Sequence, residues 1–197
     1  KHPRQVCTLR LTSNVGKGEA VRRGMRAALR RQPVFVGYWD ADLATPLDAI
    51  GRFADVLRSR PGLELVMGSR VALLGRYIRR STVRHFTGRL FATAASLVLR
   101  LPVYDTQCGA KLFRTTESLR SIISRPFGAR WIFDVEILAR MMRQTRNQTG
   151  SATQPRIYEY PLEEWRDIEG STLTASDFLI AGIDLTAIYW RNRSNTP

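Results

Sequence analysis

A run of six apolar residues, 34–39, ends abruptly in the acidic step Asp40-Ala41-Asp42, and this feature constrains the fold more than any other. An unbroken apolar run of that length predicts a strand buried on both faces. Apolar residues recur at helical spacing before it, over 19–31, and after it, over 45–58, and a further strand is expected over 63–67. Strands that alternate with helices predict an α/β fold with a mostly parallel, Rossmann-like sheet flanked by helices.

The remaining elements are expected to be less regular. In the 45–58 helix, Thr45 is expected to cap the first turn, and Leu47, Ile50, Phe53 and Leu57 to be buried. The chain shows no repeat and no linker, so residues 1–197 are predicted to form a single domain with a loose tail at 192–197. Further strands are expected at 6–12, 111–114 and 156–162, and further helices at 79–101, 115–123, 131–146 and 175–190.

The charge balance is strongly basic. Lys and Arg number 31 against 17 Asp and Glu, for a net charge of +14, and only three of the basic residues are lysines. Three explanations are open: a compositional preference for arginine on solvated faces, attraction to an anionic surface or substrate, and nucleic-acid binding. No zinc-finger spacing, aromatic RNA-binding strand or basic-region heptad accompanies the charge, so no nucleic-acid partner is expected.

The cysteines and the apolar segments indicate in which cellular compartment the protein is expected. Two distant cysteines, Cys7 and Cys108, form neither a metal-site spacing nor a disulfide framework, which indicates a reduced, cytoplasmic protein. Cys108 has no readable histidine partner and is expected to be a buried structural thiol. No signal peptide and no apolar run of membrane-spanning length is expected.

The acidic step is the strongest chemical signal. Ligands of open α/β sheets bind at the carboxyl ends of strands, and Asp40 and Asp42 lie at such an end. Two carboxylates there can hold Mg²⁺ or Mn²⁺ together with substrate phosphates. The alternative is a pair of acids in a turn that caps the next helix, and the buried strand before them favours the metal site.

Other polar stretches are more ambiguous. The loop around Gly16-Lys17-Gly18 precedes a helix and can approach an anion, although its spacing alone favours an ordinary strand-to-helix turn. Arg79-Arg80-Ser81 opens a helix and is either a phosphate site or a solvated basic start. Asp134 and Glu136 are two residues apart in one helix, so at most one of them is expected to face the site.

Six stretches together resemble a known family. In order along the chain they are NVGKGEAVRRGM, YWDADLATP, VMGSR, YDTQCGAKLFR, RWIFDVEIL and the WRDIEGSTL region. The chain is similar to family 2 glycosyltransferases, which have the GT-A fold, and within them to the dolichyl-phosphate β-glucosyltransferase type. The resemblance runs from about residue 14 to about residue 184. It also implies that the family's N-terminal base-binding strands are absent, so that the chain corresponds to about three quarters of the usual catalytic domain.

The resemblance implies a role for each matching residue. Asp40 and Asp42 would bind the divalent ion, and Asp42, Asp105, Asp134 and Glu136 would be the catalytic carboxylates. Donor or phosphate binding would fall to Lys17, Asp40, Arg70, Gln107, Lys111, Arg166 and Ser171, and binding of the acceptor phosphate to Arg79, Arg80 and Ser81.

The resemblance also implies an activity. The expected reaction is inverting transfer of a sugar, most simply glucose from UDP-glucose, to a polyprenyl or dolichyl phosphate, with Mg²⁺ or Mn²⁺ as cofactor. GDP-mannose or another donor is an open alternative, as is a catalytically incomplete fragment. The arginine excess would then dock the protein peripherally on the anionic cytoplasmic face of a membrane.

Overall fold

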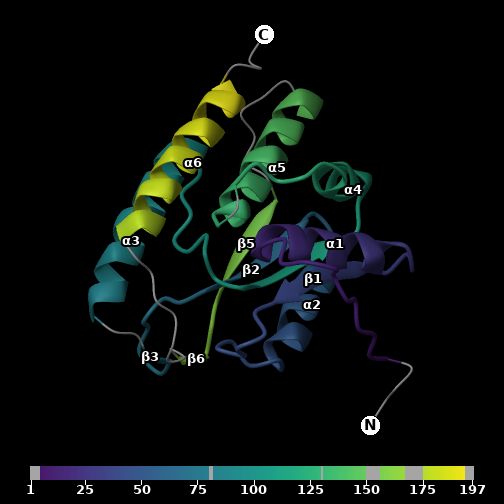
Figure 1. Cartoon of the computed structure of the whole chain (residues 1–197). Coiled ribbons are helices and arrows are strands. Elements are labelled where there is room, and N and C mark those ends of the chain that lie inside the picture. Colours follow the sequence, from purple (N-terminus) through teal and green to yellow (C-terminus); the bar gives the residue numbers. More distant parts are fainter. Residues whose placement is uncertain (1–4, 80–81, 130, 150–155, 167–174, 194–197) are drawn as a thin grey trace.

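The computed structural model describes residues 5–79, 82–129, 131–149, 156–166 and 175–193 (Figure 1). The helices in this part are α1 (Lys17–Leu29), α2 (Ala49–Ser59), α3 (Thr82–Leu99), α4 (Glu117–Ser124), α5 (Phe133–Thr149) and α6 (Ala175–Arg193). The strands are β1 (Phe35–Trp39), β2 (Leu65–Ser69), β3 (Tyr77–Arg79), β4 (Ala110–Arg114), β5 (Ile157–Pro161) and β6 (Glu164–Arg166).

The main sheet has the strand order β1-β4-β2-β5. β4 pairs antiparallel with both β1 and β2, whereas β2 pairs parallel with β5. Three of the four strands therefore run in the same direction, and the α/β class predicted from the sequence is confirmed. The pairing is mixed because β4 lies between β1 and β2 in the opposite direction.

A glycine allows β1 and β4 to approach closely. Gly37 lies in the middle of β1 opposite Leu112, and a Cβ at Gly37 would lie 2.2 Å from the carbonyl oxygen of Lys111. A side chain at this position would therefore separate the two strands. The glycine is the sequence signal that β1 has a close neighbour, although it does not say which strand that neighbour is.

Helices cover both faces of the sheet. Leu65, Met67 and Phe113 point into the larger core cluster, which they share with α1, α3, α4, α5 and α6. Val66 and Leu112 alternate with them and point to the opposite face, where they pack with α2. Figure 1 shows α3, α5 and α6 grouped at one end of the molecule and α2 at the other. The period-2 alternation of these strands fixes which helices lie on which side.

Several expectations about single elements were wrong. Residues 6–12 form no strand, because they make no backbone hydrogen bonds with any described strand. Val6 and Leu9 are exposed. The helix expected from Thr45 begins at Ala49, after a turn closed by hydrogen bonds from residue i+3 to residue i. Leu47 and Ile50 are therefore exposed, whereas Phe53 and Leu57 are buried as expected.

A second, two-stranded sheet pairs β3 with β6 in parallel. Three-residue strands are too short to show a period, so neither was predicted. Tyr77 N donates to Glu163 O, and Leu162 N donates to Ser69 O, which joins this small sheet to the end of β2. The segment around β6 is thereby positioned at the carboxyl edge of the main sheet.

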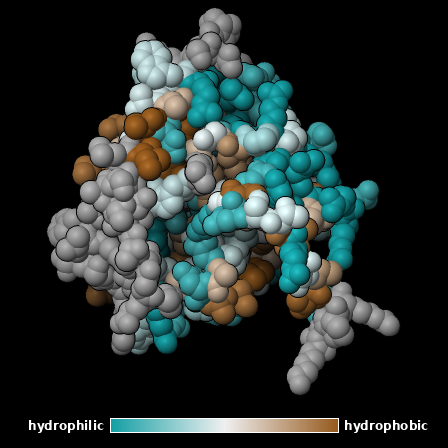
Figure 2. All heavy atoms as spheres, viewed as in Figure 1, coloured by the Kyte–Doolittle hydropathy of each residue, from teal (hydrophilic) through white to brown (hydrophobic). Residues whose placement is uncertain are grey.

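No helix in the described ranges is long and apolar enough to cross a membrane. Apolar side chains are nonetheless exposed on α3 and α6, and Figure 2 shows hydrophobic surface over this helix pair. They are Leu90, Leu97, Ile180, Ile183 and Trp190. On the inner side of α6, Ala181, Leu185 and Ile188 are buried in the core, so over the described side chains 180–191 α6 packs along one face and exposes apolar residues on the other.

Candidate active site

Polar residues from three strands meet at one edge of the main sheet. β1 ends immediately before Asp40 and β2 ends immediately before Arg70. Because β4 runs antiparallel to both, its first residue lies at this same edge, and the segment 105–109 leads into it. The topology therefore brings together acidic and basic residues that are far apart in the sequence, as the position of ligand sites in α/β sheets predicts.

Asp40 is held between a lysine and a glycine. Its backbone N donates to Gly109 O at 2.9 Å, and its Oδ1 lies 2.7 Å from Lys17 Nζ. A Cβ at Gly109 would lie 1.9 Å from Asp40 Oδ2, so only glycine leaves room for this carboxylate. Lys17, at the first turn of α1, therefore lies beside the acidic step.

Asp42 lies in the turn that follows. Its Oδ1 accepts a hydrogen bond from Ala44 N at 3.0 Å, and Asp42 is exposed. Neither acid caps α2, because that helix begins only at Ala49. Arg166 N donates to Ala44 O at 3.2 Å, so the end of β6 is fixed to this turn. Arg166 itself is exposed, with Nη2 2.5 Å from Glu164 Oε1.

Arg70 and Asp105 form a buried two-point ion pair. Arg70 Nε lies 2.6 Å from Asp105 Oδ2 and Nη2 lies 2.7 Å from Oδ1. Burial alone would raise the pKa of the Asp105 carboxyl, but the charge of Arg70 and its hydrogen bonds outweigh burial and lower the pKa to about 2. Asp105 is therefore ionised at neutral pH. The Arg70 guanidinium also lies 5.3 Å from the ring centroid of Trp165.

Glu159 on β5 supports the same segment, and sequence reasoning missed it. Its two oxygens accept hydrogen bonds from Tyr104 N and Asp105 N, both at 2.8 Å. Burial raises the pKa of Glu159, against the opposing effect of these two amides. Gln107 N donates to Asp105 Oδ1 at 3.2 Å, so the turn after Asp105 is fixed as well. The alternating strand pattern had indicated β5 but gave no sign of this contact.

Lys111 lies in the core, below the edge. Its ammonium donates to Thr106 O at 3.0 Å and Cys108 O at 2.6 Å, and lies 2.6 Å from Asp134 Oδ1. An ammonium has three protons, and these three partners account for all of them. Lys111 is fully buried, so it positions the segment before β4. The expectation that Lys111 faces an open donor pocket is therefore wrong. Tyr38 OH also donates to Asp134, in a very short hydrogen bond.

Asp134 and Glu136 face different neighbours, which confirms the expectation from their spacing. Asp134 contacts Lys111, under the edge of the sheet. Glu136 instead accepts from Ala129 N at 2.8 Å and pairs with Arg140 at 2.7 Å, between α5 and its neighbouring helices. Glu136 is therefore not part of the residues gathered at the edge, and its expected catalytic role does not fit its position.

The remaining expected residues are described only in part. Arg79 is paired with Arg166 in the β3–β6 register, but its side chain lies outside the described part of the structure, as do Arg80, Ser81 and Ser171. Cys108 is buried, and burial raises the pKa of its thiol, so it is a structural residue as expected. No group of three His, Cys, Asp or Glu side chains that could hold a metal by itself occurs among the described residues.

The fold and the edge define a class. An α/β sheet flanked by helices on both faces, with an acidic step after a buried strand, is consistent with the Rossmann-like GT-A fold of glycosyltransferases. No protein-family model matches the chain. Individual relatives do match it over almost its whole length.

These relatives share one description. The chain is 33% identical over 197 residues to a dolichyl-phosphate β-glucosyltransferase of Trichomonas vaginalis, covering 97% of this chain and 54% of that protein. It is 30% identical over 203 residues to the human protein of the same name, covering 95% and 55%. A Dictyostelium discoideum relative, also a dolichyl-phosphate β-glucosyltransferase, is 36% identical over 134 residues, covering 66% and 40%. The chain is homologous over almost its whole length to dolichyl-phosphate β-glucosyltransferases, and it spans about half the length of the curated relatives it matches.

Proposed function

We propose that this chain is the donor-binding and catalytic part of an inverting glucosyltransferase that transfers glucose from UDP-glucose to dolichyl or another polyprenyl phosphate. The observation that carries the proposal is the partly exposed acidic step Asp40-Ala41-Asp42 at the sheet edge, in a chain whose relatives are named for this reaction. Asp105 and Asp134 are buried and paired with Arg70 and Lys111, whereas Asp40 is partly exposed and Asp42 is exposed, so a donor can reach these two carboxylates.

The carboxylate oxygens at the acidic step are suitable ligands for a hard divalent cation. Asp40 and Asp42 supply carboxylate oxygens, which Mg²⁺ and Mn²⁺ prefer, and substrate phosphates usually complete such a shell. When bound, the ion would screen the charge on the departing diphosphate. Lys17 is about half exposed, so its long side chain can move from Asp40 to a phosphate oxygen of the donor.

The reaction requires no strong base. A phosphate oxygen of the acceptor is already anionic at neutral pH and forms a bond to the anomeric carbon while the bond to UDP breaks, which inverts that carbon. The low pKa of Asp105 agrees with such a reaction, because this carboxylate would not take up a proton near pH 7. The work of the edge residues is then to position the reactants and stabilise charge.

The acceptor phosphate is assigned to the basic end of the small sheet. The β3–β6 register aligns the backbones of Arg79 and Arg166. The hydrogen bond from Arg166 N to Ala44 O ties this end to the turn that carries Asp42. An anion bound there would lie near the donor diphosphate. The positive charge of two arginines would then offset the repulsion between the two phosphate groups.

Peripheral membrane contact, at the cytoplasmic face, is part of the proposal. A lipid acceptor requires access to a membrane surface, and the exposed apolar side chains of α3 and α6 provide one suitable face. The net charge of +14 favours an anionic surface, at about 1 kcal/mol for each basic residue close to it.

Calorimetric titration of the chain with UDP-glucose, with and without Mn²⁺, tests the donor site. We expect Mn²⁺-dependent binding that is lost in Asp40→Ala/Asp42→Ala. The matched control is Asp48→Ala/Asp55→Ala, which removes two exposed carboxylates of the α2 region and should bind like the wild type. Binding that persists in Asp40→Ala/Asp42→Ala, or that ignores Mn²⁺, would contradict the proposed site. A parallel titration with GDP-mannose separates the two candidate donors.

A further inference from the structure

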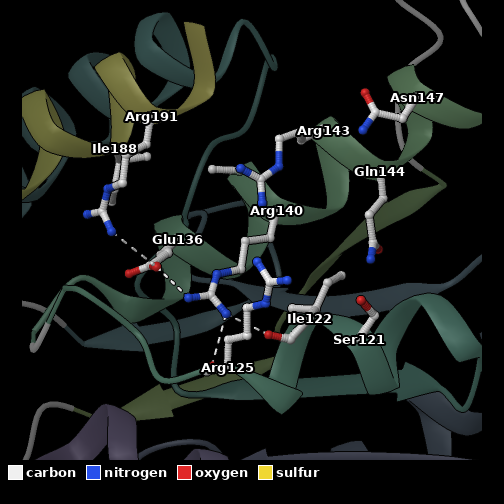
Figure 3. A pocket seen from close by; sticks show the side chains of 11 residues that line it. Ser121, Ile122, Arg125, Glu136, Arg140, Arg143, Gln144, Asn147, Ile188 and Arg191 are labelled. Atoms are coloured by element: carbon white, nitrogen blue, oxygen red, sulfur yellow. Dashed lines mark hydrogen bonds and ion pairs between the residues drawn. The ribbon is translucent and has the colours of Figure 1, made fainter. Parts of the chain in front are cut away.

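A pocket of about 340 Å³ opens between α4, α5 and α6, and none of its lining residues belongs to the cluster at the sheet edge (Figure 3). We propose that this pocket binds a phosphate-bearing anion, separately from the donor and the acceptor. The proposal concerns a second site and is independent of the function proposed above.

Positive charge dominates the lining. Four arginines contribute to it, against one acidic residue, Glu136, which leaves an excess of three positive charges. Figure 3 shows these side chains arranged around one space, with the guanidinium groups of different helices facing it. The arginines are Arg125, Arg140, Arg143 and Arg191.

Two members of the pocket are fully engaged with each other and with the backbone. Arg140 donates to the carbonyl oxygens of Ile122 at 2.6 Å and Pro126 at 2.6 Å, and it pairs with Glu136 at 2.7 Å. Glu136 also accepts from Ala129 N at 2.8 Å. Arg140 and Glu136 therefore form one wall of the pocket, and this carboxylate has no contact with Arg125 or Arg143 in the described part of the chain.

Arg125 and Arg143 are the unmatched charges. Neither guanidinium has a hydrogen bond or an ion pair within the described part of the chain, although both line the pocket. Arg191 is partly matched, since its Nη1 lies 3.7 Å from Glu136 Oε1 and its Nε donates to Ala187 O at 3.2 Å. Like charges collected in one hollow repel each other, and a bound anion would remove that cost.

The backbone makes room for this arrangement. A Cβ at Gly128 would lie 2.4 Å from Arg191 Nη1 and 3.0 Å from Nη2. Glycine at this position therefore lets the guanidinium of α6 lie against the segment between α4 and α5. A side chain there would require the Arg191 guanidinium to shift from this position.

The chemistry of the lining identifies the ligand class. Guanidinium groups bind phosphate oxygens through paired, charge-assisted hydrogen bonds. Gln144 and Asn147 add neutral polar groups to one side, while Ile122 and Ile188 give part of the wall an apolar character. A phosphate ester or a diphosphate satisfies these groups, and it could come from a lipid headgroup or from a free metabolite.

The test is calorimetric titration with inorganic pyrophosphate in the presence of EDTA, which keeps metal-dependent binding at the acidic edge out of the measurement. We expect the wild type to bind, and Arg125→Gln/Arg143→Gln to bind about tenfold or more weakly, because each substitution removes a charge-assisted hydrogen bond. The matched control is Arg26→Gln/Arg30→Gln, which removes the same charge from exposed positions at and just after the end of α1. Asp40→Ala/Asp42→Ala should bind pyrophosphate like the wild type.

Each outcome decides the proposal. No binding by the wild type, or equal losses in the two arginine double variants, would overturn it, since the second result would reflect only the general field of a basic chain. If Arg125→Gln/Arg143→Gln melts below the wild type, Arg143→Gln alone replaces it, with Arg30→Gln as its control. Sedimentation with phosphatidic acid vesicles then distinguishes the sources. A selective loss of vesicle binding indicates a lipid headgroup, and pyrophosphate binding without it indicates a free ligand.

Discussion

Arg70 and Asp105 are joined by two short contacts, Nε to Oδ2 at 2.6 Å and Nη2 to Oδ1 at 2.7 Å, and Arg70 N also donates to Oδ2 at 3.1 Å. One carboxylate thus fixes both the end of β2 and the segment that leads into β4. Because Asp105 is buried and the Arg70 side chain is only 14% exposed, removal of either one leaves a charge without compensation. The pair is therefore a structural requirement of the edge at which the donor is proposed to bind.

Replacement of this carboxylate should change how stability depends on pH. The pKa of Asp105 is about 2 in the folded protein against 3.8 for the free group, so its ionised form stabilises the fold above about pH 4. That contribution, about 2 kcal/mol, is lost as the pH falls from about 4 toward 2. We expect Asp105→Asn to be less stable at pH 7 and to show a shallower loss of stability in acid.

Urea denaturation between about pH 7 and pH 3 measures both effects. The control is Asp48→Asn, an exposed carboxylate, which should follow the wild type across this range. Coincident curves for Asp105→Asn and the wild type would show that the ion pair does not contribute to stability, and parallel but offset curves would show that the pKa shift of Asp105 does not.

The sequence predicts the acidic end of the site better than its basic and buried parts. The run 34–39 and the step Asp40-Ala41-Asp42 are contiguous, so both the strand and the two carboxylates that follow it are visible in one stretch. The order of the strands is not visible, because periodicity shows that a strand exists but not which strand pairs with it. The insertion of β4 between β1 and β2 is therefore a property of tertiary packing.

Buried charge is harder still to predict. Lysine is usually a surface residue. Only the three-dimensional contacts show that Thr106, Cys108 and Asp134 accept the hydrogen bonds of the buried Lys111 ammonium. The difference between Asp134 and Glu136 could be predicted, since a two-residue separation places side chains on different sides of a helix. Which of them faces the edge depends on the packing of α5, which the sequence alone does not specify.

Gly109 should be essential for the position of Asp40. In Gly109→Ala the added Cβ would lie 1.9 Å from Asp40 Oδ2 and 2.0 Å from Cγ, so the carboxylate must move away from its position beside Lys17. We expect Mn²⁺-dependent binding of UDP-glucose to fall by about tenfold or more, with a loss of about 1 to 3 kcal/mol in stability. Calorimetry and urea denaturation measure the two effects separately.

A second glycine provides the control for that substitution. Gly24 lies in α1 with no atom within 4 Å of an added Cβ, and alanine favours a helix over glycine. Gly24→Ala should therefore bind UDP-glucose normally and be slightly more stable. Normal binding by Gly109→Ala would show that the placement of Asp40 is not required.

Lys111→Met should destabilise the protein far more than a surface substitution would. Methionine matches the length of the lysine chain but leaves Asp134 buried without its cation, which costs about 3 to 5 kcal/mol. Part of that loss should return in Lys111→Met/Asp134→Asn, because the second change removes the uncompensated charge. Urea denaturation of the two single variants and the double variant measures the coupling. Additive losses would mean that the two residues do not act as a pair.

The exposed apolar residues of α3 and α6 should govern contact with lipid. Leu97 and Ile183 are 73% and 70% exposed, and an apolar side chain that remains in water when the protein is free can enter the headgroup region of a membrane at little cost. Leu97→Ser/Ile183→Ser should therefore weaken sedimentation with vesicles that contain anionic lipid, with an unchanged melting temperature. Val6→Ser/Val34→Ser is the matched control, since these side chains are 75% and 70% exposed but lie outside both helices. If both double variants lose binding equally, or neither does, the α3–α6 face is not the membrane contact. If only the first loses binding, the α3–α6 face is the membrane contact, and under the proposed function the same variant should transfer glucose more slowly to vesicle-bound polyprenyl phosphate than to a short water-soluble analogue.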